Sequence, residues 1–345
     1  MRLFQFVILV LLVFTPFAVA LAQEISPVSP PITAEAINAA DLSIVPAKPL
    51  PPAADTTTGS DTAAPPSVPD PAIVKLQILL DRAGASPGVI DGFTGDNIRK
   101  AISAFETMSG LPSDGSIDAD VLAKLSTTEP VIGGYVITDK DVADIVAPVP
   151  TDYAEMAKRD FLGYTRVTEE LAERFHMDED LLKDLNPAAQ WTAGETVAVA
   201  AYGPNKEGKV ARIEADKSDR QLRAYDADGK LLVAYPATIG SADNPSPTGT
   251  HLVDAVAPMP NYTYNPDVNF QQGDNTKKLI IPPGPNGPVG AMWIDLTEPT
   301  FGIHGTPEPS KIDKTNSHGC VRLTNWDAEE LSTMVENGVP VDFVG

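Results

Sequence analysis

Cysteine is almost absent from this chain, since Cys320 is the only cysteine among 345 residues. A single thiol excludes an internal disulfide framework, and exported proteins that use cysteines for structure usually pair them. A lone cysteine is commonly a small buried apolar residue, but it can also be a reactive nucleophile. The residues around Cys320 therefore indicate which of these two interpretations applies.

Positive charge is also scarce. Lysine and arginine number 25 against 47 aspartates and glutamates, which gives a formal net charge of −22 and an isoelectric point near 4.4. A surface of this charge repels the phosphates of nucleic acids, so nucleic acid is excluded as a predicted partner. The same balance provides no polybasic anchor for anionic lipids. At this length, two or three domains are expected.

Long apolar runs are missing except near the N-terminus. Arg2 precedes an almost entirely apolar stretch from residue 3 to residue 20, and Ala20-Leu21-Ala22 fits a small-x-small cleavage site. Residues 1–22 are therefore predicted to be a signal peptide, with an uncleaved membrane anchor as the alternative. A signal peptide implies export to the periplasm or the cell wall.

Residues 23–70 are rich in proline, alanine, serine and threonine. Such a segment cannot bury enough apolar surface to offset the entropy lost on ordering, which predicts a disordered or polyproline-like linker. A tolerated low-complexity tail without a spacer role is the alternative.

Residues 71–126 have the pattern of a compact helical bundle. Three apolar stretches with helical spacing are separated by turn-rich segments at 91–96 and 111–115. The segment resembles the small peptidoglycan-binding domain found beside wall enzymes, which implies a three-helix fold. Glu106 stands where that family usually has glutamine, and a bundle that only spaces or rigidifies is the alternative. The matching residues are Leu76, Gln77, Asp91, Gly92, Gly95, Ala101, Phe105, Gly110, Leu111, Asp114 and Gly115.

Residues 150–202 combine two helical patterns with a short strand. Apolar residues recur with helical spacing from 171 to 185, and Val197 and Val199 alternate in a short edge strand. The run Leu185-Asn186-Pro187 and the strand are similar to the back half of a LysM glycan-binding module, which implies a small α/β module. The Gly-Asp-Thr turn of the front half is absent. His176 lies in this region, and no chemistry is assigned to it.

Residues 208–345 turn to strands. Short alternating stretches are separated by glycine- and proline-rich turns, and Asp228-Gly229 is typical of a hairpin. This pattern favours a mainly-β domain, either a β-sandwich or a barrel-like sheet. His251 falls on a predicted strand and is interpreted as structural. The aromatic residues Tyr262, Tyr264 and Phe270 belong either to a mobile loop over a cleft or to simple loop packing.

The residues best suited to catalysis surround the single cysteine. A free thiol has a pKa of roughly 8.5, so little of it is thiolate near neutral pH, and a nearby histidine can remove its proton. His304 and His318 both lie close to Cys320 in the sequence. Glycines in a turn let backbone N–H groups approach a reacting carbonyl, and an arginine offers a planar fork for a carboxylate. The candidates that accompany Cys320 and His304 are Gly305, Ser317, His318, Gly319 and Arg322.

Zinc binding by His304, His318 and Cys320 is an alternative, because catalytic zinc sites use three protein ligands. The spacing of these residues fits none of the short zinc signatures well. No metal and no cofactor is therefore predicted.

The run from Ser317 to Leu323, preceded by Ile303-His304-Gly305-Thr306, resembles the signature of the bacterial cell-wall L,D-transpeptidases of the YkuD/ErfK type. The likeness extends over residues 209–345. It implies that Cys320 is the acylated nucleophile and His304 the general acid/base.

The resemblance also implies roles for the neighbours of these two residues. The carbonyl of Gly305 would hold the imidazole in the right tautomer, and backbone N–H groups around Gly319 and Cys320 would form an oxyanion hole. Arg322 would meet a carboxylate of the peptide, and His318 would pack or contact substrate.

The implied activity is peptidoglycan L,D-transpeptidation. Cys320 attacks the L,D bond of a tetrapeptide stem, D-alanine leaves, and an amine acceptor takes the acyl group. The predicted partners are the stem peptides and glycan of peptidoglycan. The acceptor is left open among diaminopimelate on another stem, an outer-membrane protein amine and water. A hydrolase of the same fold and a catalytically silent wall-binding protein are the alternatives.

Overall fold

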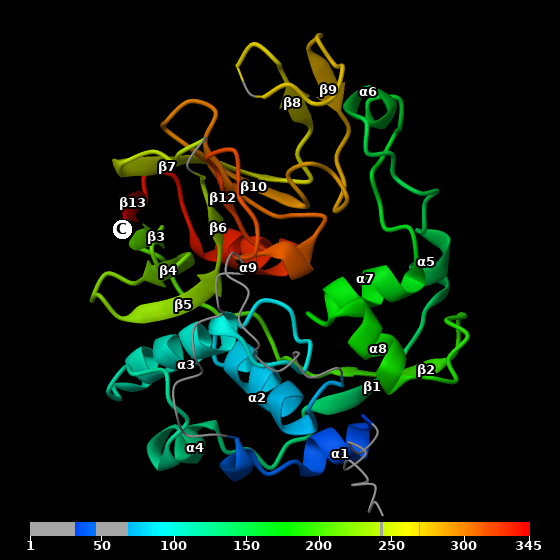
Figure 1. Cartoon of the computed structure of the whole chain (residues 1–345), viewed down its shortest axis with the longest axis vertical. Helices are drawn as coiled ribbons and strands as arrows, with labels where there is room; N and C mark the ends of the chain where they lie inside the picture. Colours follow the sequence, from blue (N-terminus) through cyan, green and yellow to red (C-terminus); the bar gives the residue numbers. More distant parts are fainter. Residues whose placement is uncertain (1–31, 46–67, 242–243, 269) are drawn as a thin grey trace, which may run out of the picture. The chain divides into compact units, whose positions relative to one another are not determined.

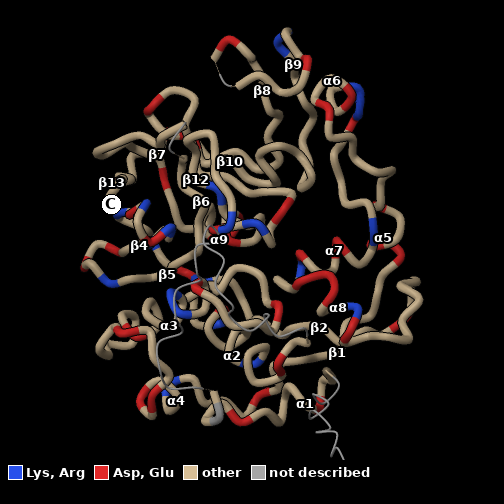
Figure 2. Tube along the Cα trace, in the orientation of Figure 1, with Lys and Arg blue, Asp and Glu red and all other residues tan. Residues whose placement is uncertain are grey.

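The computed structural model describes residues 32–45, 68–241, 244–268 and 270–345. The predicted signal peptide, residues 1–22, lies outside the described residues. Within the described part of the chain, no helix is long and apolar enough to cross a membrane. Acidic side chains occur on elements all along the described chain (Figure 2).

Part of the predicted linker is folded, which differs from the expectation of disorder over residues 23–70. Helix α1 (Ala34–Ala39) and the 3-10 helix η1 (Leu42–Ile44) contact α2. Ile37 is completely buried, and Lys75 Nζ donates to the carbonyls of Asn38 and Ala40 at 3.0 and 2.7 Å. The composition of the whole segment concealed this short apolar stretch, which is stabilised by packing on a neighbouring helix rather than by its own core.

The predicted helical bundle is present as α2 (Pro71–Arg82), α3 (Asp96–Ser109) and α4 (Ala119–Leu125). Asp70 caps α2 by accepting a hydrogen bond from Ala72 N at 2.7 Å, and proline at the first helical position suits a helix start. Glu106 is buried, and its Oε2 accepts from the backbone N–H groups of Asp114 and Gly115 at 2.9 and 2.8 Å. The departure from glutamine at this position is therefore compatible with the fold, because the carboxylate closes the second turn.

The middle region contains four helices and a two-stranded sheet. Strand β1 (Ile132–Val136) pairs antiparallel with β2 (Thr196–Ala200), so the sheet includes a strand that precedes residue 150. The predicted helical patterns and edge strand are present. The helices are α5 (Asp139–Ala143), α6 (Tyr153–Met156), α7 (Val167–Arg174) and α8 (Glu179–Leu185).

The C-terminal region is mainly β, as the sequence predicts. Nine strands form one sheet in the order β5-β4-β3-β13-β7-β10-β11-β12-β6. Helix α9 (Asn325–Met334) contacts β10 and β11 (Figure 1). Its Leu331 is completely buried. The strands are β3 (Arg212–Asp216), β4 (Gln221–Tyr225), β5 (Leu231–Pro236), β6 (Thr238–Ile239), β7 (Gly249–Pro258), β10 (Met292–Leu296), β11 (Gly302–His304), β12 (Val321–Arg322) and β13 (Pro340–Val344).

A separate hairpin of β8 (Tyr262–Tyr264) and β9 (Leu279–Ile281) carries the predicted aromatic segment. Tyr264 is completely buried, and it shares a small core with Leu162 and Ile281. The hairpin therefore packs on a segment that precedes the β domain in the sequence.

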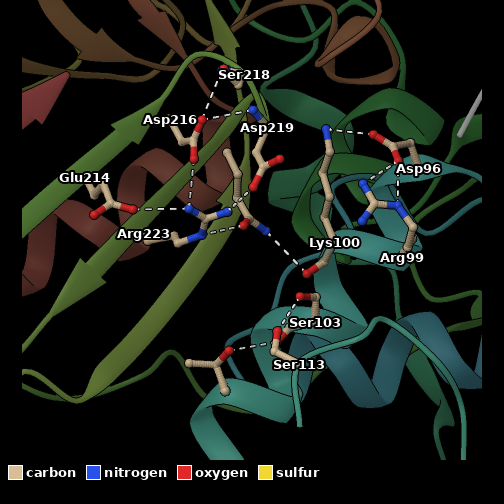
Figure 3. Close-up of polar contacts among 12 residues, drawn as sticks. Asp96, Arg99, Lys100, Ser103, Ser113, Glu214, Asp216, Ser218, Asp219 and Arg223 are labelled. Atoms are coloured by element: carbon tan, nitrogen blue, oxygen red, sulfur yellow. Dashed lines mark hydrogen bonds and ion pairs between the residues drawn. The ribbon is translucent and has the colours of Figure 1, made fainter. Parts of the chain in front are cut away.

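The helical bundle and the large sheet are joined by polar contacts. Lys100 of α3 makes an ion pair with Asp313 at 2.9 Å, and Gln221 Nε2 of β4 donates to the Lys100 carbonyl at 3.4 Å. Gln221 in turn accepts from Arg223, which pairs with Asp216 and other carboxylates (Figure 3). Asp313 lies seven positions before Cys320, so this contact reaches the loop that leads to the cysteine.

Candidate active site

Parallel strand pairing brings the histidine and the cysteine regions together. Strand β11 ends at His304, and β12 begins directly after Cys320. The two strands are parallel neighbours, with Ile303 opposite Val321 and His304 opposite Arg322. The 3-10 helix η2 (Pro309–Lys311) lies in the loop between them. Residues that are sixteen positions apart in the sequence therefore line one cavity.

The His304 ring is held in one tautomer. Its Nδ1 lies 2.6 Å from the carbonyl oxygen of Gly305. A carbonyl can only accept, so Nδ1 carries the proton and Nε2 keeps a free lone pair. The ring is buried and stacks on Trp293 with centroids 5.5 Å apart. The structure thus contains the hydrogen bond to the Gly305 carbonyl that the resemblance to the L,D-transpeptidases implied.

Burial also keeps this ring neutral. Loss of solvent, followed by the positive charge of Arg322, lowers the pKa of His304 to about 3. An unprotonated imidazole at neutral pH is a base that is ready to accept a proton through Nε2.

Cys320 is half-buried at the end of the loop. Burial raises the pKa of its thiol, while the backbone of Gly302 and the charge of Arg322 act in the opposite direction. Its Sγ lies 3.7 Å from the carbonyl oxygen of Thr300, a residue with a left-handed φ of 75°. The thiol and the imidazole therefore both rest in their neutral forms.

Ser317 and Gly319 shape the loop beneath the thiol. Ser317 Oγ donates to the Cys320 carbonyl at 2.7 Å and accepts from the N–H groups of Gly240 and Gly319 at 2.7 and 3.2 Å. Gly319 has a φ of 108°, and a Cβ at this position would lie 2.5 Å from Phe301. Since Gly319 N–H already has a partner, Cys320 N–H is the remaining donor of the predicted oxyanion pair. Direct contact of Ser317 with substrate stays a prediction.

A cavity of about 380 Å³ opens onto these residues. Arg322 lines it, and within the described residues no carboxylate pairs with its guanidinium. His318 is exposed at the rim and stacks on Phe270 with centroids 3.9 Å apart and planes 10° apart. The remaining lining includes Tyr153, Asn244, Pro245, Tyr262, Val268, Pro288, Val289, Trp293, Thr300 and Phe301.

Comparison with known proteins identifies this arrangement. A family model described as the L,D-transpeptidase catalytic domain (YkuD) matches residues 210–342. A protein of Bacillus licheniformis named putative L,D-transpeptidase YkuD is 31% identical over 178 residues, which cover 51% of this chain and 92% of that relative. The chain belongs to the YkuD family of L,D-transpeptidases.

A second curated relative carries the same name. The putative L,D-transpeptidase YkuD of Bacillus subtilis is 27% identical over 173 residues, covering 50% of this chain and 89% of the relative. The crystal structure of L,D-transpeptidase 3 from Mycobacterium tuberculosis in complex with a faropenem-derived adduct aligns with 45% of this chain and 76% of that chain, at 17% identity and a TM-score of 0.33.

A second family model matches the helical bundle. A model described as a putative peptidoglycan binding domain matches residues 69–125, as the sequence resemblance implied. These two family models leave out residues 150–202, so the LysM-like assignment of that region stays a prediction.

Several residues of this YkuD-family site were not singled out in the sequence. Asn325 at the start of α9 accepts from Ala291 N at 3.0 Å and donates through Nδ2 to Glu173 Oε2 at 2.7 Å. Trp293 supports the His304 ring from the neighbouring strand, and its place directly across β10–β11 depends on register. Neither residue carries a local signal that separates it from ordinary core packing.

The zinc alternative finds no support in the arrangement of side chains. Among the residues described, no group of three or more histidine, cysteine, aspartate or glutamate side chains is placed to hold a metal ion.

Proposed function

We propose that this chain is an exported peptidoglycan L,D-transpeptidase in which Cys320 carries the acyl group and His304 transfers its proton. One observation carries the proposal: a neutral imidazole, fixed through Nδ1 on the Gly305 carbonyl, lines the same cavity as the single thiol and Arg322, which has no carboxylate partner in the described part of the chain. Membership of the L,D-transpeptidase family supports the same chemistry.

The first half-reaction breaks the L,D bond of a tetrapeptide stem. His304 Nε2 takes the proton of the Cys320 thiol as Sγ attacks the carbonyl carbon before the terminal D-alanine. The developing oxyanion accepts a hydrogen bond from the backbone N–H of Cys320. The carbon–nitrogen bond then breaks, the imidazolium returns its proton to the leaving amine, and a thioester remains.

The second half-reaction transfers the acyl group. An acceptor amine attacks the thioester carbon and gives a proton to His304, and the carbon–sulfur bond breaks as the thiol is re-formed. The amine is diaminopimelate on another stem or the terminal amine of an outer-membrane protein. Water as the acceptor would make the same site a carboxypeptidase or endopeptidase.

Arg322 is placed to hold the substrate. A half-buried guanidinium without a carboxylate partner in the described residues retains its binding capacity for an external anion, and stem peptides carry carboxylates. Burial, and after it the charge of the same cation, lowers the pKa of His304 and of the exposed His318. A bound carboxylate would therefore offset a charge that keeps the base neutral.

The remaining regions fit a wall enzyme. The apolar segment at residues 1–22 supports export to the periplasm or cell wall, and the peptidoglycan-binding family match at residues 69–125 supports attachment to the polymer. The LysM-like region adds a second candidate for glycan contact. Together they would hold the catalytic cavity against its substrate.

Product analysis tests this function. Wild-type and Cys320→Ala protein are incubated with purified tetrapeptide muropeptides, and the products are weighed by mass spectrometry. We expect D-alanine release and cross-linked dimers with the wild type and neither with the variant. Tripeptides alone would indicate the hydrolase, and no turnover by the wild type would indicate a silent wall-binding protein.

A further inference from the structure

One residue of the catalytic cavity comes from outside the catalytic domain. Tyr153 lies in α6, well before the region 210–342 that matches the L,D-transpeptidase model. It nevertheless lines the cavity together with Cys320 and Arg322. Tyr153 also lies close to the Arg322 guanidinium, since each of the two side chains affects the pKa of the other.

Hydrogen bonds fasten the α6 segment to the aromatic hairpin. Tyr153 N donates to Gln272 Oε1 at 3.2 Å, and Gln272 Nε2 donates back to the Thr151 carbonyl at 3.0 Å. Asn275 Nδ2 donates to Asp152 Oδ2 at 2.9 Å. Two side chains of the hairpin loop thus hold three consecutive residues of the segment.

Aromatic packing fixes the direction of the Tyr153 ring. It makes edge contacts with Tyr262, Tyr264 and Phe270, with centroid distances of 5.9, 5.2 and 6.1 Å. Val149 and Met156 pack around the same small core. The ring is therefore oriented by three neighbours before any substrate arrives.

The hydroxyl of Tyr153 is free to bind substrate. Within the described residues it has no hydrogen-bond partner, although the ring is half-buried. Burial raises its pKa to about 12, so it is a neutral phenol that can donate at any physiological pH. A hydrogen-bond donor and a guanidinium that has no carboxylate partner in the described ranges share one cavity, and together they suit an oxygen anion.

We propose that Tyr153 is a substrate-binding residue that donates a hydrogen bond to the terminal carboxylate of the donor peptide beside Arg322. That carboxylate is the one nearest to the scissile carbonyl, which must lie at Cys320 two positions before Arg322. The segment ahead of the catalytic domain thereby sets the preference for a peptide with a free C-terminus. This inference rests on the proposed function.

The test measures binding without turnover. Full-length Cys320→Ala protein, with and without Tyr153→Phe, is titrated calorimetrically with a tetrapeptide stem and with the same peptide as its C-terminal amide. Phenylalanine keeps the aromatic packing and removes only the hydroxyl. We expect Tyr153→Phe to weaken binding of the acid by about tenfold and to leave binding of the amide nearly unchanged.

Tyr264→Phe is the matched control. Tyr264 belongs to the same aromatic cluster, but its hydroxyl bonds to Gln272 N and the Asn275 carbonyl at 2.8 and 3.0 Å and does not line the cavity. Its loss should affect acid and amide alike. Equal losses for both peptides in Tyr153→Phe, or no loss, would overturn the assignment. Turnover by the wild type separately decides the proposed function, because these titrations do not depend on it.

Discussion

At the scale of single residues, the proposed catalytic pair of His304 and Cys320 rests uncharged. Burial lowers the pKa of the imidazole of His304 and raises the pKa of the thiol of Cys320, so the thiolate–imidazolium form is disfavoured before substrate binds. A neutral thiol is less reactive than a thiolate, which protects this lone cysteine from unwanted oxidation. In the proposed reaction, proton transfer would therefore accompany the attack of the thiol on the carbonyl instead of preceding it.

The alkylation profile of Cys320 follows from this. The rate of reaction with iodoacetamide should keep rising beyond pH 9, because the thiolate is the reactive form and burial raises the pKa of this thiol. Intact-mass measurements at fixed times from pH 6 to pH 10 give the profile. A rate that already levels off below pH 8 would show an ion pair in the resting enzyme.

Gly290 tests the packing behind the histidine. It has a φ of 63°, and a Cβ there would lie 2.1 Å from Asn325 Oδ1 and 2.5 Å from the Gly305 carbonyl carbon. Gly290→Ala should lower the free energy of unfolding by about 3 kcal/mol and reduce turnover. Gly338→Ala is the control, since Gly338 has a φ of 91° but open space around it, and about 1 kcal/mol is expected. Equal losses in urea denaturation would show that backbone strain alone matters.

The sequence predicts single residues of the cavity better than it predicts the contacts between them. Cys320, His304 and Arg322 occur in one long motif, so their grouping in the cavity follows from local spacing and one strand pairing. The hydrogen bond from Gly240 N to Ser317 Oγ and the stacking of Trp293 on His304 depend on distances across strands, which spacing along the chain does not determine.

At the scale of elements, helix α9 connects the catalytic strands with the middle region. Asn325, its first residue, reaches both the turn at Ala291 and Glu173 of α7. Glu173 is buried beside Tyr164, whose hydroxyl is 3.3 Å from its Oε2. A carboxyl group therefore forms the junction between α7 and α9.

The stability of this junction should depend on pH. Burial raises the pKa of Glu173 from 4.5 to about 8, so the folded state holds the proton more tightly than the unfolded chain. The stabilisation is complete below pH 4.5 and is lost as the pH rises to about 8. Between pH 5 and pH 8 the wild type should lose roughly 3 kcal/mol more unfolding free energy than Glu173→Gln.

Chemical denaturation of both proteins at several pH values measures this difference, with Glu129→Gln, at an exposed position, as the control. Parallel pH curves for wild type and Glu173→Gln would contradict the assignment of a buried proton to Glu173.

Helix and strand positions were largely predictable from periodicity. The α2 and α3 patterns and the strands β4 and β5 lie where apolar spacing and the turn at 228–229 indicate. The folded segment at residues 32–45 was missed, because its helix is short and its apolar residues gain their burial from α2 and from β1. Stability that comes from tertiary contact leaves no periodic signal.

At the scale of the whole chain, the contact between Lys100 and Asp313 joins the peptidoglycan-binding bundle to the loop before Cys320. Both side chains are largely buried, at 6% and 10% exposed, and Lys100 also pairs with Asp96 at 3.0 Å. Removing Lys100 would leave the buried Asp313 carboxylate only Arg220, at 3.7 Å, as a cationic partner among the described residues.

Lys100→Met should therefore lower the free energy of unfolding by about 3 kcal/mol. Lys140→Met is the control, because Lys140 pairs with Asp144 on the surface at 79% exposure and should change stability by less than about 1 kcal/mol. Urea denaturation compares the two. Similar small effects from both substitutions would show that the pair does not couple the bundle to the catalytic loop.

The association of the modules could not be predicted from the sequence. Resemblance indicated separate regions, but the delivery of Tyr153 into the catalytic cavity and the bond between Glu173 and Asn325 connect residues more than a hundred positions apart. Only the folded chain brings them together, because neither contact has a repeating pattern or a motif.

The position of the acyl group tests the central claim most directly. Wild-type protein is mixed with tetrapeptide muropeptide, quenched in acid within seconds, and digested for mass spectrometry. We predict a tripeptide muropeptide thioester on the peptide that contains Cys320, released by hydroxylamine. Turnover with an adduct on another residue, or with Cys320 found only as a free thiol throughout, would contradict the account.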